Sequence, residues 1–386
     1  MQEYRSRVQK LVQSAFAGKP KDIISQSVAK ALYGEVSPYS ATRLERFAAC
    51  AFAHFLQYGM KLTERVEYEF KPMDMGNVMH EALESFAEEV RKRGMKWTEL
   101  TEQERNEIAD RCLDNIVADY GNTVLKSSAR NEYMIERTRR ILRRTVWALQ
   151  KQLEQGEFQP EGFEVTFGGG RIDRVDIMED QNKVYVKVID YKTGNTSFDL
   201  VYLYHGLQLQ LMIYLDGALR VEQKKYPDKE IIPAGVFYYN IKDPMIQEKI
   251  DADVEAVSAG LMKELKMNGL AQADPELVYR MDSSLGSIPV AFNKDGSFRK
   301  NSSVADRTQF AVLGRYVRTK IEKIRSSILE GDAEVSPYEL GKKNACTYCP
   351  YMTVCGFDRR LSGYEFRRLK NFSDEELWKA FDREAE

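Results

Sequence analysis

The chain has 386 residues, of which 43% are hydrophobic and 30% charged, as expected of a protein with a packed core and a polar surface. Lys and Arg number 57 against 59 for Asp and Glu, so the formal net charge is −2 and any nucleic-acid-binding surface must be local. Apolar runs of about 18 residues are absent and the first residues lack a signal-peptide core, so we expect a cytoplasmic protein with no membrane segment. No Walker A pattern for ATP binding occurs.

The first part of the chain is predicted to be helical. Residues 1–36 indicate one or two amphipathic helices. Residues 37–40 (Ser-Pro-Tyr-Ser) indicate the start of another helix, in which Thr42 and Glu45 have the spacing of a capping box. Cys50 lies off the apolar stripe of this helix and is free to face another partner. The stripe consists of Leu44, Phe47, Ala48, Ala51, Phe52 and Phe55.

Two more helical regions follow. We predict a helix from residue 76 to about residue 93, and residues 99–153 are predicted to be helical throughout. The second region contains a cluster of arginines. A solvated helix face is a better interpretation of this cluster than a track for a DNA backbone. Its members are Arg137, Arg139, Arg140, Arg143 and Arg144.

From about Gln159 the pattern becomes that of β-strands, with a hairpin turn at residues 179–182. A helix, a strand and two more helices follow, and a polar tail ends in a short helix near Leu377. This order predicts an α/β fold with a mixed central sheet. The predicted strands are 163–167, 171–178, 184–191 and 236–240, and the predicted helices are 204–221, 252–268 and 304–330.

Acidic residues at the predicted hairpin suggest a metal site. Asp190 and Lys192 project from one face of their strand because side chains alternate. A turn near residues 180–181 pairs Asp173 with Val188, which places Asp173 diagonal to Asp190 on that face. Two such carboxylates can share a Mg²⁺ ion, which generates an attacking hydroxide. Lys192 would orient the water or neutralise the phosphate, although Asp-x-Lys alone is more often a solvated ion pair.

Three other residues are candidates for the same site. His80 can supply a further metal ligand, and Glu84, four residues later, can orient it, although a lone histidine is more often a satisfied polar residue near the core. Gln210 and Tyr214 share a helix face and can reach a phosphate or a base edge. The alternative for this pair is that it borders a core.

Cysteines at the two ends of the chain suggest a second centre. Cys346, Cys349 and Cys355 can converge with the distant Cys50 on one ion or cluster. Zinc sites usually pair two C-x2-C knuckles, and this spacing fits them poorly, whereas iron–sulfur clusters accept varied spacing. Cys112 lies in a helical run and is interpreted as a plain buried thiol.

These motifs resemble those of the RecB-type nucleases of the PD-(D/E)XK superfamily. The resemblance covers about residues 30–360. The cysteines resemble the split iron–sulfur ligands of the AddB family, whose members act with an AddA-type helicase–nuclease subunit on DNA ends during double-strand break repair. The motifs are Gly76-x3-His80, Gly170-Arg-Ile-Asp173-Arg-Val-Asp176, Ile189-Asp190-Tyr191-Lys192-Thr-Gly, Gln210-x3-Tyr214, and Cys50 with Cys346-x2-Cys349-x5-Cys355.

The resemblance implies a role for each matching residue. His80, Asp173, Asp190 and the carbonyl of Tyr191 would bind Mg²⁺ or Mn²⁺, and Lys192 would be the catalytic lysine. Gln210 and Tyr214 would lie near DNA, either single-stranded or at duplex ends. A 4Fe–4S cluster would be bound by Cys50, Cys346, Cys349 and Cys355.

The same resemblance implies a restriction-endonuclease-like core with helical insertions and an iron–sulfur clasp joining the N- and C-terminal segments. The expected divisions are a helical segment at 1–36, the nuclease domain at 37–360 and a tail at 361–386. Two positions depart from the family: Ala51 and Ile172 stand where many relatives have proline. Because helicase-like domains precede this region in the family, we expect an excised C-terminal piece rather than a standalone nuclease.

Two other functions fit the sequence less well. A standalone or CRISPR-associated iron–sulfur exonuclease shares the core and cluster, but the long helical inserts at 99–153 and 252–330 argue against it. A non-catalytic scaffold that binds DNA ends would not need Asp173, Asp190 and Lys192. The sequence therefore favours a metal-dependent deoxyribonuclease, expected to act as an exonuclease.

Overall fold

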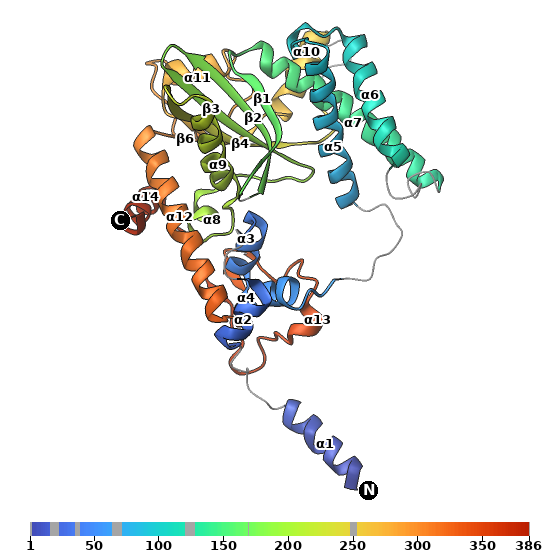
Figure 1. Cartoon of the computed structure of the whole chain (residues 1–386), viewed down its shortest axis with the longest axis vertical. Helices are drawn as coiled ribbons and strands as arrows, with labels where there is room; N and C mark the ends of the chain where they lie inside the picture. Colours follow the sequence, from blue (N-terminus) through green and yellow to red (C-terminus); the bar gives the residue numbers. More distant parts are fainter. Residues whose placement is uncertain are drawn as a thin grey trace. The chain divides into compact units, whose positions relative to one another are not determined.

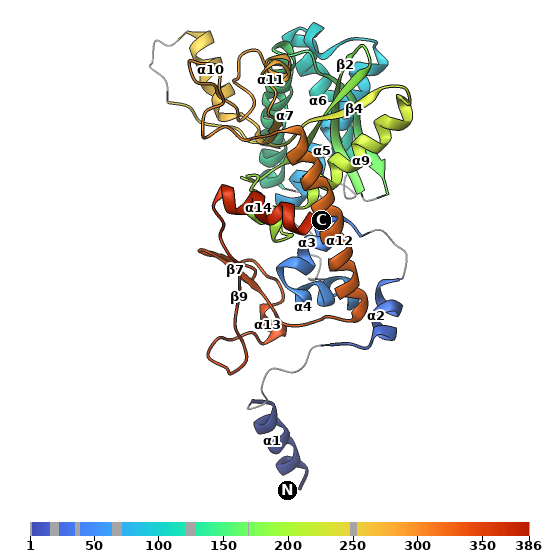
Figure 2. The same ribbon diagram turned by 90° about the vertical axis from the view of Figure 1, so that its left-hand side faces the viewer.

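The computed structural model describes residues 2–15, 23–34, 39–63, 72–119, 128–168, 170–247 and 253–385 (Figures 1 and 2). The chain divides into two compact units. Unit 1 comprises residues 1–65, 200–209 and 315–386, and unit 2 comprises residues 66–199 and 210–314. The predicted divisions at 36 and 360 stay a prediction.

A mixed six-stranded sheet forms the centre of unit 2, as predicted (Figure 1). The first three strands pair antiparallel, β3 pairs parallel with β4, β4 antiparallel with β5, and β5 parallel with β6. The parallel pair requires a crossover, which contains the helix α9. In sheet order the strands are β1 (Gln159–Phe167), β2 (Gly170–Asp180), β3 (Lys183–Lys192), β4 (Glu230–Asn240), β5 (Asn268–Gln272) and β6 (Val304–Ala305).

Helices cover both faces of this sheet. Ile189 and Tyr191 of β3 belong to one large core cluster with side chains from the helices α5, α6 and α7. The helix α9 contacts β2, β3 and β4, and its first residue bonds Lys192 on the other face. Asp190 and Lys192 therefore face α9, because successive side chains point to opposite faces. The helices are α5 (Pro72–Lys92), α6 (Glu102–Asp119), α7 (Ala129–Glu154) and α9 (Gln210–Lys225).

The β2–β3 register differs from the predicted one by two residues. Val188 pairs with Val175, and Arg174 pairs with Ile189, so the ladder extended by one residue sets Asp173 directly opposite Asp190. The prediction of Asp173 beside Val188 was wrong because the tight turn lies at residues 181–182, one position later than assumed. A shift of two residues preserves the face of each side chain, so the two carboxylates still share one face.

Several predicted helices are interrupted or shorter. Residues 204–221 form the end of α8 (Leu200–Tyr204) and most of α9, with a break between them. Residues 99–153 form the end of a 3-10 turn and two helices, α6 and α7, with residues 120–127 outside the described part. The region 252–268 contains α10 (Val254–Glu264) and then enters β5, and residue 252 also lies outside that part. The helix α12 (Arg307–Glu330) follows β6.

In unit 1, the helix around Cys50 is broken at that residue. Ser40 caps the helix α3 (Ala41–Ala49) by accepting from Arg43 N, so the predicted Thr42–Glu45 capping box is wrong. Glu45 instead accepts a hydrogen bond from Leu209 N at 2.7 Å. Cys50 is extended, with φ −166°, before the chain continues as α4 (Ala51–His54) and a π turn. Ser37 and Pro38 lie outside the described residues.

The remaining described elements of unit 1 are short or terminal. Residues 1–36 contain α1 (Gln2–Ala15) and α2 (Gln26–Tyr33), and the tail ends in α14 (Asp374–Ala385), as predicted. A small sheet in the order β8-β7-β9 flanks the cysteine segment. Among the helices described, none has both the length and the apolar character needed to cross a bilayer. The small elements are β7 (Tyr338–Leu340), β8 (Lys343–Asn344), α13 (Met352–Cys355) and β9 (Arg367–Arg368).

A buried ion triad lies under the sheet on the face opposite Asp173. Asp176 pairs with Arg174 at 2.6 Å and with Lys187 at 3.0 Å, and all three side chains are buried. Burial alone would raise the pKa of Asp176, but the two cations outweigh it and hold that pKa below its usual value. The carboxylate is therefore the counter-ion that keeps two buried cations tolerable here.

We expect Asp176→Ala to lower the free energy of unfolding by about 3–5 kcal/mol, because it leaves two buried cations without their carboxylate. Urea denaturation followed by circular dichroism measures the change. The matched control is Asp228→Ala, which removes an exposed aspartate and should change stability by less than about 0.5 kcal/mol. Equal stability of the two variants would contradict a structural role for the triad.

Candidate functional site

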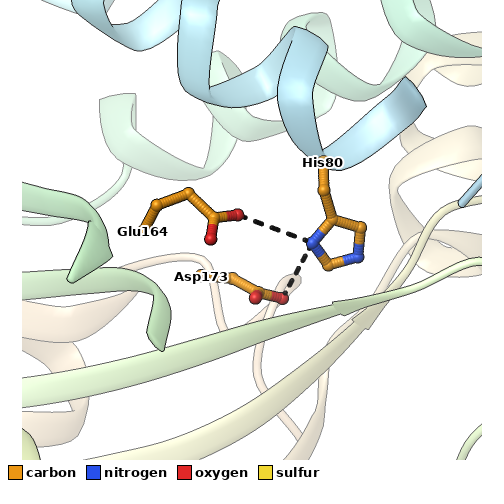
Figure 3. A group of neighbouring side chains, drawn as sticks. All are labelled: His80, Glu164 and Asp173. Atoms are coloured by element: carbon orange, nitrogen blue, oxygen red, sulfur yellow. Dashed lines mark ion pairs between the residues drawn. The ribbon is translucent and has the colours of Figure 1, made fainter. Parts of the chain in front are cut away.

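Three side chains from three elements of unit 2 converge at one end of the sheet (Figure 3). The helix α5 supplies His80, β1 supplies Glu164 and β2 supplies Asp173. His80 Nδ1 lies 3.4 Å from Asp173 Oδ2 and 3.8 Å from Glu164 Oε1. The three potential ligand atoms all lie within 4.8 Å of one another, which is close enough for a single cation to bind all three.

Glu164 was not identified from the sequence. It lies in β1 between Phe163, which pairs with Arg174, and Val165, which pairs with Ile172, and so it sits opposite Asp173. Its backbone has φ +50°, a conformation that side chains other than glycine rarely adopt, and its carboxylate is only 6% exposed. The available signal was the short connection between β1 and β2, which fixes this pairing.

The Asp190 carboxylate lies beside this cluster and is also buried. Burial first, and then the neighbouring Asp173 carboxylate, raise the pKa of Asp190 to about 7, although Lys192 and His80 partly oppose the shift. Lys192 Nζ lies 2.7 Å from Asp190 Oδ2. A carboxyl poised in this way is typical of a functional site, because ionising it costs free energy that a bound cation restores.

The backbone of Tyr191 links the two sides of the cluster. Its N–H donates to Asp173 Oδ2 at 2.7 Å, and its carbonyl oxygen lies 3.1 Å from His80 Nε2. Burial lowers the pKa of His80, but the carboxylates of Asp173 and Glu164 outweigh burial and raise that pKa to about 10. The ring contacts are thus Glu164, Asp173 and Tyr191, whereas the sequence analysis expected Glu84 as its partner.

The donor set fits a hard divalent cation. Carboxylate oxygens, a backbone carbonyl and an imidazole are oxygen-rich ligands of the kind that Mg²⁺ and Mn²⁺ accept. The positive charge that the protonated His80 brings among the carboxylates can equally be supplied by such a cation. The predicted His80, Asp173, Asp190 and Tyr191 therefore meet in one place, while their roles as ligands stay predictions.

Gln210 and Tyr214 join the site through Lys192. Lys192 Nζ donates to Gln210 Oε1 at 2.7 Å, and Gln210 Nε2 donates to Tyr214 OH at 2.9 Å. Because α9 begins at Gln210, this residue stands in the first turn, directly beside the end of β3. The two residues therefore hold the lysine amine in position, and their contact with DNA stays a prediction.

The other four predicted residues gather in unit 1. Cys50, Cys346, Cys349 and Cys355 line one small cavity, and all four are free thiols. Burial, together with the charges of the other three sulfurs, raises the pKa of Cys346 to about 12. Cys112 lies instead in the apolar core of unit 2, as expected of a plain buried thiol.

Comparisons with known proteins agree with this geometry. The model of the family described as "PD-(D/E)XK nuclease superfamily" matches residues 38–356. The chain is 42% identical to the AddB subunit of the ATP-dependent helicase/deoxyribonuclease of Lachnoclostridium phytofermentans, over 99% of this chain and 35% of that protein. The proteins of the same name from Thermoanaerobacter sp. and Clostridium acetobutylicum are 34% and 35% identical, over 99% and 94% of this chain. The chain spans about a third of the length of these relatives.

The raised pKa of Asp190 predicts a pH-dependent effect on stability. In metal-free protein the folded state binds this proton up to about pH 7, whereas the unfolded state releases it near pH 4. The ionised carboxylate therefore destabilises the fold progressively as pH rises through this window. We expect Asp190→Asn to match the wild type at pH 4 and to be more stable by about 2–4 kcal/mol at pH 8, measured by urea denaturation in EDTA.

The matched control is Asp382→Asn in α14, which removes an exposed carboxylate and should give no such gain. A wild type as stable as Asp190→Asn at pH 8 would show that the carboxylate is not held against its preference for water.

Proposed function

The chain belongs to the PD-(D/E)XK nuclease superfamily, and from this premise we propose that it hydrolyses phosphodiester bonds of DNA with a divalent metal ion. The observation that carries the proposal is the meeting of His80, Glu164 and Asp173 beside the Asp190–Lys192 pair. The substrate is a DNA end or a single strand, digested exonucleolytically. Because the relatives are named as one subunit of an ATP-dependent helicase/deoxyribonuclease, the proposal includes an AddA-type partner and double-strand break repair.

The chain's own residues divide the work at this site. His80, Asp173, Asp190 and the Tyr191 carbonyl hold Mg²⁺ or Mn²⁺, and the structure adds Glu164 to this set. When bound, the ion activates water and offsets charge on the scissile phosphate. Lys192 places its ammonium beside Asp190, where it can orient that water or pair with a phosphate oxygen. Gln210 fixes the ammonium, and Tyr214 fixes the Gln210 amide.

We expect Lys192→Ala to reduce cleavage of end-labelled single-stranded DNA by about 10²-fold or more in Mg²⁺ or Mn²⁺, because the positioned cation is lost. Lys183→Ala removes an exposed lysine at the other end of the same strand and should leave the rate unchanged. A circular single strand should resist digestion if the enzyme needs an end. Lys192→Ala with wild-type activity would overturn the assignment, and DNA binding without metal-dependent cleavage would favour a scaffold.

We also propose that the four cysteines of unit 1 bind a 4Fe–4S cluster. A mononuclear zinc site brings its sulfurs to about 3.8 Å from one another, as follows from tetrahedral Zn–S bonds of about 2.3 Å. Within the part of the chain that the structure describes, the only group of three potential ligand atoms found within 4.8 Å is His80, Glu164 and Asp173. A wider spacing of the sulfurs supports a cluster with several metals.

The cluster would act as a structural clasp rather than a redox centre. Cys50 belongs to the first segment of unit 1, and the other three cysteines belong to its last segment. Binding all four would close a loop of nearly the whole chain, which restricts the unfolded state. Purified protein should then be brown and contain iron and acid-labile sulfide.

We expect Cys349→Ala to lose the visible absorbance near 400 nm and the bound iron, and to unfold at a lower temperature. Cys112→Ala is the matched control, because it removes a buried thiol outside the cavity and should retain the iron. Colourless protein containing stoichiometric zinc would replace the cluster with the alternative metal.

A further inference from the structure

A second cavity lies in unit 2 between the helices α6, α7 and α10. Its volume is about 850 Å³, within the range of pockets that enclose small organic ligands. The residues found to line it include none of the acidic site described above. The arginine cluster that the sequence suggested to be a solvated face contributes several of its walls.

One face of α7 gives this cavity a basic and aromatic wall. Arg140, Arg144, Trp147 and Lys151 recur at helical spacing, so they share a face, and all four line the cavity. Arg140 pairs with Asp243 at 2.6 Å and Lys151 with Glu154 at 2.7 Å. Arg144 stands apart from these pairs, since in the described ranges no carboxylate lies within 4.0 Å of it. Its guanidinium lies 5.5 Å from the Trp147 ring centre.

Arg105 of α6 adds a buried cation to the same cavity. Its side chain is 7% exposed and donates from Nη1 to Gln150 Oε1 at 2.7 Å. Its Nε has no hydrogen-bond acceptor, and no carboxylate of the described residues lies within 4.0 Å. Burial lowers the pKa of Arg105, and the more distant Glu102 and Glu154 only partly oppose this. A buried guanidinium without a counter-ion is costly, so the site favours an anion.

We propose that this cavity binds a nucleoside monophosphate unit, with its phosphate between Arg105 and Arg144 and its base against Trp147. Arginine is the side chain best matched to phosphate, and an indole ring stacks on any base. The α10 side of the cavity contributes Val254, Val257 and Leu261, which give the ring of the base an apolar surface. Inorganic phosphate alone would leave this surface and the indole uncovered.

The unit can come from two sources, a free nucleotide released by digestion or one residue of a single strand. The inference rests on the proposed function for both sources, because that reaction supplies the nucleotide and uses the strand. Both sources present the same phosphate and base. The experiment therefore measures both ligands on the same variants.

The test measures binding to the whole chain in EDTA, where the metal-free acidic site repels phosphate. The probes are dTMP, thymidine and a fluorescein-labelled oligothymidylate, followed by calorimetry and fluorescence anisotropy. We expect Arg144→Gln and Arg105→Gln each to weaken dTMP binding about tenfold or more, and thymidine to bind more weakly than dTMP. Arg130→Gln, an exposed arginine of the same helix outside the cavity, should bind like the wild type.

Parallel weakening of dTMP and the oligonucleotide would assign the cavity to a strand, and weakening of dTMP alone would assign it to a free nucleotide. Unchanged dTMP affinity in Arg144→Gln, which does not remove a fully buried group, overturns the proposal, as does equal affinity for thymidine. Cleavage assays on Asp190→Asn judge the nuclease assignment separately. Retained cleavage there would sink that assignment while the binding data still decide the cavity.

Discussion

The repulsion between Asp173 and Asp190 across adjacent strands is the constraint on which the acidic site depends. The ladder sets them opposite each other on a buried face, where an ionised pair is unfavourable without a cation. Everything nearby offsets this cost: Lys192 pairs with one carboxylate, His80 contacts the other, and the Tyr191 amide donates to Asp173. The same arrangement that burdens the fold creates affinity for a divalent ion.

The sheet supplies this constraint through its two differently filled faces. On one side Tyr191 and Ile189 join a continuous apolar core with α5, α6 and α7, and the Arg174–Asp176–Lys187 triad is also buried there. On the other side the strand ends carry the charged groups of the site. Strand β3 therefore cannot slip by one residue without exchanging core side chains for charged ones. The energetics of the core thus fix the position of the functional groups.

Sequence reasoning predicted what depends on strand periodicity and failed where longer-range pairing decides. The alternation in β2 and β3 was sufficient to place Asp173, Asp190 and Lys192 on one face, even with a register wrong by two residues. Glu164 was missed because its place depends on the pairing of β1 with β2 and on an unusual φ. Residues 268–272 were predicted to end or follow a helix, but pairing with β4 makes them a strand. Tertiary contacts overrode local propensity there.

The division of unit 1 among three chain segments has a consequence for biosynthesis. Unit 2 is fully translated once residue 314 has been made, whereas the last segment of unit 1 begins only afterwards. The ribosome adds 346 − 50 = 296 residues between Cys50 and Cys346, which takes roughly 15–60 s at bacterial elongation rates. During that interval Cys50 waits as a lone thiol, so metal delivery to this cavity must follow the maturation of the nuclease core and cannot guide it.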